Sequence, residues 1–161
     1  MKRIAAIAVL MCLFTAAMAE AGTPRIGARV DAIRLPDTSG VIVDTGRFKG
    51  RTVVVFFWNN LCGCSEQLLA LKPFVAARKN RPFAFVTVNE GQGKAIVESF
   101  IHGNRLPYEA LLDVDLAVGK KNFGIKVLPT IFVVDKDGIL REKLIGVIDT
   151  RRLETIIQRY L

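Results

Sequence analysis

The run Thr-Val-Val-Val-Phe-Phe-Trp at residues 52–58 constrains the fold more than any other segment of this chain. A continuous series of β-branched and aromatic residues is typical of a strand that is buried on both faces of a sheet. A predicted helix, residues 64–78, follows it with Leu68, Leu71 and Val75 on one apolar stripe. A fully buried strand that runs into an amphipathic helix predicts an α/β fold.

The rest of the chain continues this alternation of strands and helices. We expect short strands within 30–43, a buried strand at 83–89, helices at 93–101 and 115–123, a hairpin of strands at 130–135 and 139–146, and a last helix from about Thr150. The apolar side chains expected to face inward are Ile96, Val97, Phe100 and Ile101 in the second helix, and Leu153, Ile156, Ile157, Tyr160 and Leu161 in the last. The order predicts an α/β sandwich with a central mixed β-sheet flanked by helices.

The first 19 residues have the composition of a secretory signal peptide. Lys2 and Arg3 precede an apolar stretch from Ile4 to Ala17, and the sequence Ala17-Met18-Ala19 has the small residues of a cleavage site. We therefore expect cleavage after residue 19, one domain at 20–161, and a periplasmic or extracytoplasmic location that is oxidising. Retention of the signal peptide as an anchor stays open.

The composition excludes several functions. The net charge is +8, but Lys and Arg are scattered and form no basic stripe interleaved with aromatic residues, so we expect no nucleic-acid partner. With 3 Cys and 1 His the chain has too few ligands for a structural zinc site built from these residues.

Cys62 and Cys64 stand where the buried strand ends and the helix begins. Unpaired backbone N–H groups at a helix start favour the thiolate, which is the attacking species in disulfide exchange, and a second thiol nearby can release the mixed disulfide. Downstream, Pro129 lies immediately before a predicted strand and is a candidate cis proline beside the thiols. This pattern favours redox chemistry over two structural cysteines and a turn proline.

These segments resemble the thioredoxin-like proteins of the TlpA/ResA type over nearly all of residues 20–161. The matching motifs are Leu35-Pro36-Asp37 with Ser39-Gly40, Phe48-Lys49-Gly50-Arg51, the strand ending in Phe57-Trp58, Asn122-Phe123-Gly124-Ile125, Val127-Leu128-Pro129-Thr130 and the run from Phe132 to Gly138. The resemblance implies a thioredoxin-like fold, a cis bond before Pro129, and thiol-disulfide exchange with exported proteins, in settings such as cytochrome c maturation or metal-centre assembly.

The active-site motif departs from this family, which has Trp-Cys-x-x-Cys. Here Leu61 replaces the tryptophan, and only Gly63 separates the cysteines. Without a gap, Ser65 takes the place of the second cysteine; with one residue deleted, Cys64 does. At 100° per residue Cys64 shares the stripe of Leu68, Leu71 and Val75, whereas Ser65 does not, which favours Cys64 as a buried resolving cysteine.

The short spacing has a second consequence. Side chains at i and i+2 of a helix point about 200° apart, so we expect the chain to open around Gly63, whose φ is unrestricted. A disulfide across this short spacing would depart from relaxed geometry, and strained disulfides are more easily reduced. We therefore expect an oxidant or isomerase.

Family members of the cytochrome-maturation type carry an acid shortly after an Asn-x-Gly stretch. In Asn89-Glu90-Gly91-Gln92 that place holds Gln92, and we interpret Glu90 as a solvated loop residue rather than a substitute for the acid.

We therefore predict catalytic roles for Cys62, Cys64 and Pro129, and substrate contacts for Trp58, Leu61 and Leu128, without a cofactor or a metal. The expected partners are exported thiol or disulfide proteins and a membrane thiol reductase as electron donor. The alternative is a copper-binding or copper-delivery protein, in which the Cys-Gly-Cys thiolates and His102 bind Cu(I). A peroxidase is disfavoured, because no Pro-x-x-x-Thr motif precedes Cys62.

Overall fold

The computed structural model describes residues 23–61 and 63–161, so the expected signal peptide and Cys62 lie outside the described residues. Its strands are β1 (Arg34–Pro36), β2 (Ile42–Asp44), β3 (Thr52–Trp58), β4 (Phe83–Glu90), β5 (Glu109–Asp113), β6 (Thr130–Val134) and β7 (Leu140–Ile145). The helices are η1 (Thr45–Phe48), α1 (Cys64–Ala76), α2 (Lys94–Gly103), the π-helix η2 (Ala117–Asn122) and α3 (Thr150–Gln158).

The central sheet has five strands in the order β5-β4-β3-β6-β7, and β1 pairs with β2 in a separate antiparallel ribbon. Strands β3, β4 and β5 are parallel, whereas β6 runs antiparallel to both β3 and β7. The mixed sheet predicted from the sequence is confirmed. The continuous apolar run of β3 has its physical reason here, because the strand lies in the middle of the sheet with both faces covered.

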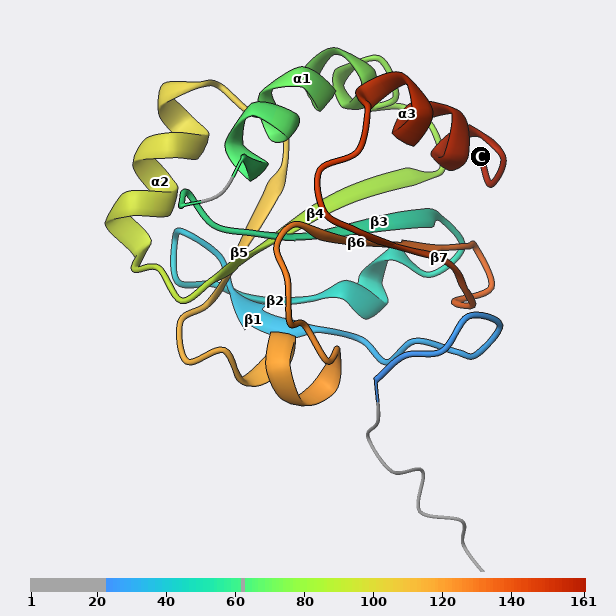
Figure 1. The fold of residues 1–161 in the computed structure, drawn as a ribbon, viewed down its shortest axis with the longest axis horizontal. Helices are drawn as coiled ribbons and strands as arrows, with labels where there is room; N and C mark the ends of the chain where they lie inside the picture. Colours follow the sequence, from blue (N-terminus) through green and yellow to red (C-terminus); the bar gives the residue numbers. More distant parts are fainter. Residues whose placement is uncertain (1–22, 62) are drawn as a thin grey trace, which may run out of the picture.

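Helices α1, α2 and α3 cover one face of the sheet, and the β1–β2 ribbon with η2 lies on the other (Figure 1). The first face packs Phe56, Leu68, Leu71 and Leu153 into one apolar core, and the second packs Val55, Phe57, Phe123 and Phe132 into another. The helix predicted at 64–78 is confirmed as α1, with its apolar stripe buried.

Three features of the fold differ from the sequence-based expectations. Strand β5 was not predicted, and it forms the edge of the sheet beside β4. The helix expected at 115–123 is the shorter π-helix η2. Ile96 and Leu161, both expected to face inward, are exposed, because α2 buries Val97 and Ile101 instead and Leu161 lies beyond the end of α3.

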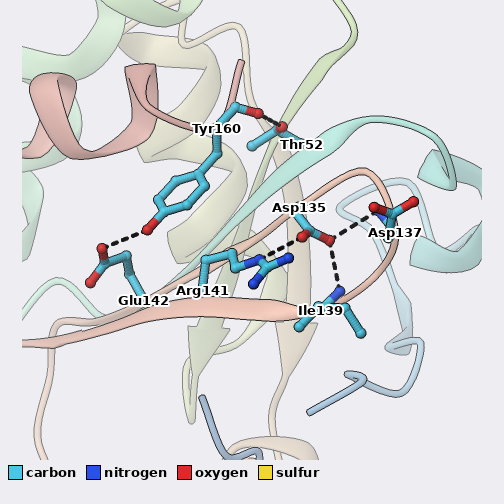
Figure 2. A network of polar contacts seen from close by, with 7 residues as sticks. All are labelled: Thr52, Asp135, Asp137, Ile139, Arg141, Glu142 and Tyr160. Atoms are coloured by element: carbon cyan, nitrogen blue, oxygen red, sulfur yellow. Dashed lines mark hydrogen bonds and ion pairs between the residues drawn. The ribbon is translucent and has the colours of Figure 1, made fainter. Parts of the chain in front are cut away.

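Polar contacts fasten the end of the chain and the β6–β7 turn (Figure 2). The Thr52 hydroxyl donates to the backbone carbonyl of Tyr160, and the Tyr160 hydroxyl donates to Glu142 at 2.8 Å. Burial alone would raise the pKa of Asp135, but hydrogen bonds from Ile139 and Asp137 N–H and from Arg141 outweigh it and lower that pKa. These contacts lie at the end of the sheet opposite to the start of α1.

Within the described residues, no helix has both the length and the apolar character needed to cross a membrane.

Candidate active site

Strand register brings Pro129 to the end of β3. Phe57 pairs with Thr130 in the antiparallel β3–β6 ladder, so Pro129 lies opposite Trp58, where β3 gives way to the loop that leads to α1. The Leu128–Pro129 bond is cis, as predicted, and Pro129 is buried. Its carbonyl accepts a hydrogen bond of 2.8 Å from the Gly146 N–H, which ties the proline to the segment after β7.

Cys64 is the first residue of α1, fully buried and disulfide-bonded. It lies in the same core cluster as Leu68, Leu71 and Val75, so the predicted phase of the helix is confirmed. Ser65 is half-buried outside that cluster. The structure therefore places Cys64, rather than Ser65, on the inner face of α1. Cys62, for which we predict a catalytic role, lies outside the residues that the structure describes.

Gly63 does not have the unusual backbone angles that we expected of a hinge at this position. It is the N-cap of α1 with φ −63° and ψ 18°, a conformation that any L-residue adopts. A Cβ built on it would lie 3.6 Å from Cγ2 of Val147 and 3.7 Å from Oε2 of Glu66, which are ordinary contacts. The expectation that this position needs glycine for its backbone freedom is wrong.

One side-chain oxygen holds the loop between β3 and α1. Oε1 of Gln92 accepts the Asn60 N–H at 2.9 Å and the Asn89 side-chain amide at 3.0 Å. The Leu61 N–H donates to Oδ1 of Asn59 at 3.0 Å within the same loop. Gln92 occupies the place where the resembled family has an acid, and its role in holding this loop was not predicted from the sequence.

The three expected substrate contacts differ in exposure. Leu61 is 87% exposed, Leu128 is half-buried beside Pro129, and both stay predictions as substrate contacts. Trp58 is fully buried, with its ring centroid 5.0 Å from that of Phe100. Its burial does not support the predicted substrate contact of Trp58, which stays a prediction.

Glu90 is not the solvated loop acid that the sequence suggested. It is the last residue of β4, only 6% exposed, and its pKa is raised to about 8 by burial and by the charge and hydrogen bonding of Asp113. Asp113 ends β5 and accepts the Gly119 N–H of η2 at 2.7 Å. Both carboxyls follow parallel strands on the η2 face, whereas Cys64 packs on the opposite face. For this carboxyl pair the sequence offered only Glu90, directly after the predicted strand at 83–89, because Asp113 ends a strand that was not predicted.

His102 is exposed near the end of α2. Among the described residues, no group of three or more His, Cys, Asp or Glu side chains is arranged to hold a metal ion. Since Cys62 lies outside that set, the copper alternative stays untested.

With this geometry in place, the comparisons define the class of protein. Residues 26–143 match the AhpC/TSA family, and the chain belongs to that family. ResA, a thiol-disulfide oxidoreductase of Bacillus cereus, is 23% identical across 94% of this chain and 88% of its own length.

Two solved structures share the fold. A thiol:disulfide interchange protein of the thioredoxin family from Chlorobium tepidum TLS is 17% identical, with a TM-score of 0.74 over 86% of this chain and 99% of its own. A secreted disulfide oxidoreductase of Mycobacterium tuberculosis is 19% identical, with a TM-score of 0.70 over 79% and 95% of the two chains. The fold is thioredoxin-like, and the chain is a distant homologue of thiol-disulfide oxidoreductases, the enzyme class that the sequence predicts.

Proposed function

We propose that this protein is an extracytoplasmic thiol-disulfide oxidoreductase that exchanges disulfides with exported proteins through Cys62 and Cys64. The observation that carries the proposal is the buried, disulfide-bonded Cys64 at the start of α1, in a chain that sets cis-Pro129 at the end of β3. A thiol at a helix start beside a second thiol is suited to exchange rather than to packing alone.

In the reducing direction, the Cys62 thiolate attacks one sulfur of a client disulfide. A mixed disulfide forms, and the other client sulfur leaves as a thiolate that takes up a proton. The Cys64 thiolate then attacks Cys62, which releases the second client thiolate and closes the Cys62–Cys64 disulfide. Two electrons pass from the protein to the client; the oxidising direction reverses each step. A membrane thiol reductase is the electron donor that we propose for the reducing direction.

The signal-like residues 1–19 support export, and the resemblance supports clients in cytochrome c maturation or metalloprotein assembly. Cys62 is proposed as the attacking residue because it precedes the helix, whereas Cys64 is buried in the core.

Single-cysteine variants test these roles with a model disulfide substrate. Cys62→Ser should abolish exchange, and Cys64→Ser should accumulate the mixed disulfide because nothing resolves it. Ser65→Ala is the matched control and should keep wild-type turnover. Full activity in Cys62→Ser, or a mixed disulfide that accumulates in Ser65→Ala but not in Cys64→Ser, would overturn the assignment.

A further inference from the structure

Four large apolar side chains are exposed around the candidate active site. They are Leu61, Val127, Ile145 and Val147, which are 87%, 51%, 60% and 63% exposed; we call them the apolar strip. The apolar strip lies next to the candidate active site, since Val147 lies beside the Gly63 backbone and Gly146 is hydrogen-bonded to Pro129. A client segment that extends from Gly63 toward Pro129 would contact these side chains.

The strip continues into a cavity with two lysines at the β6–β7 edge. The cavity measures about 290 Å³, and its lining residues are Thr23, Gly124, Lys126, Val127, Thr130, Lys143 and Ile145. None of the lining residues is Asp or Glu, and no ion pair between described residues involves Lys126 or Lys143. Lys143 Nζ lies 5.3 Å from the centroid of the Phe132 ring, so its charge is held over the sheet. We call this cavity the lysine pocket.

The first turn of α1 brings a negative charge next to Gly63. A Cβ at Gly63 would be 3.7 Å from Oε2 of Glu66, which is exposed in the first turn of α1. A client segment bound beside Gly63 and Pro129 therefore has a carboxylate near Gly63 and the cationic side chains of the lysine pocket near Val127 and Thr130.

We propose that the lysine pocket selects clients with Asp or Glu on one side of the reacting cysteine, and this inference rests on the proposed function. Val127 and Thr130, which flank Leu128 and Pro129 in the chain, line the lysine pocket, so we place the acid of an extended client a few residues from its cysteine. The apolar strip contacts the intervening residues, and the asymmetry of charge fixes the direction in which the client lies.

Two isomeric peptides test the selection without a difference in net charge. One is Asp-Asp-Ala-Cys-Ala-Lys-Lys, the other is Lys-Lys-Ala-Cys-Ala-Asp-Asp, and each cysteine is blocked as a disulfide with thionitrobenzoate. Attack by the reduced protein releases either the coloured thiolate or the peptide thiol, and both products are measured. We expect the full chain to react severalfold faster with one isomer at low salt. The difference should shrink at about 1 M salt, where the screening length is about 3 Å.

The double variant K126Q/K143Q should lose the preference for that isomer, whereas K79Q/K136Q should keep it. The control pair removes the same charge from exposed turns that do not line the lysine pocket. Melting curves on all variants establish that each is folded. Equal rates for the two isomers, or a preference that survives K126Q/K143Q, would overturn the selection alone. Failure of the protein to react with either peptide would instead refute the proposed function.

Discussion

Single side chains determine how rigidly the active-site loop is held. Gln92 accepts two hydrogen bonds with one oxygen, from the Asn60 N–H and the Asn89 amide, and so links the end of β4 to the loop before α1. A neutral amide makes these contacts without adding charge near the cysteines. A carboxylate at the same place would make them as well, but with a negative charge.

Gln92→Glu is therefore expected to fold normally and to raise the pKa of the attacking thiol, because a nearby negative charge disfavours the thiolate. The pH profile of alkylation of the reduced protein should shift to higher pH by a fraction of a unit. Gln92→Ala is the comparison: it leaves two donors without their acceptor and should lower the free energy of unfolding by about 1–3 kcal/mol. An unshifted pH profile of alkylation in Gln92→Glu would mean that the side chain at position 92 does not affect the pKa of the attacking thiol.

Glycine is required at position 119 because a Cβ there would lie 2.3 Å from both carboxyl oxygens of Glu90. Gly119→Ala should lower the free energy of unfolding by about 1–3 kcal/mol, measured by urea titration. Gly103→Ala is the control, because no atom lies within 4 Å of its Cβ position, and Ala at this helix end should be neutral or slightly stabilising. Equal stability of the two variants would mean that Glu90 is not packed against η2.

Strands β4 and β5 meet the π-helix η2 at their carboxyl ends. Strand β4 ends in Glu90 and β5 ends in Asp113, beneath η2. Asp113 accepts the Gly119 N–H of η2 and is coupled to Glu90, so we expect a change in charge at Glu90 to act on this π-helix through Asp113. The raised pKa of Glu90 makes the pair sensitive to pH in a range where ordinary carboxyls are already ionised.

Glu90 has its pKa raised from 4.5 to about 8, so the folded protein keeps a proton that the unfolded chain releases. The stability that the protonated Glu90 side chain adds to the folded state is fully present below pH 4.5 and is lost as pH rises to about 8. The free energy of unfolding falls over this range by at most about 1.4 kcal/mol per pH unit. Glu90→Gln should flatten this dependence in unfolding curves, whereas Glu154→Gln on α3 should preserve it. A slope that persists in Glu90→Gln would assign the dependence to another group.

The sequence predicts most elements because their apolar patterns are long. The seven residues of β3 and the stripe of α1 that includes Cys64 follow directly from periodicity. Strand β5 was missed because Glu-Ala-Leu-Leu-Asp is short and acidic at both ends, and it becomes a strand only by pairing with β4. Gly63 was misread because glycine permits unusual backbone angles without requiring them.

At the scale of the whole molecule, the site depends on contacts between distant segments. The motifs predict the cysteines and the proline, but only the pairing of Phe57 with Thr130 sets Pro129 at the end of β3. Gln92 and the lysine pocket are set by the meeting of separate loops and strands, for which local sequence carries no periodic signal. The fold was therefore predictable in outline, and the surroundings of the cysteines were not.

The redox couple that we propose for Cys62 and Cys64 is tested by equilibrating the chain without residues 1–19 in graded glutathione buffers. Free thiols are trapped by alkylation and counted by mass, and a tenfold change in the equilibrium constant corresponds to about 30 mV. We expect both cysteines to become reduced together, in one two-electron transition. Cysteines that remain fully alkylated in every buffer, or that form separate mixed disulfides with glutathione, would contradict it.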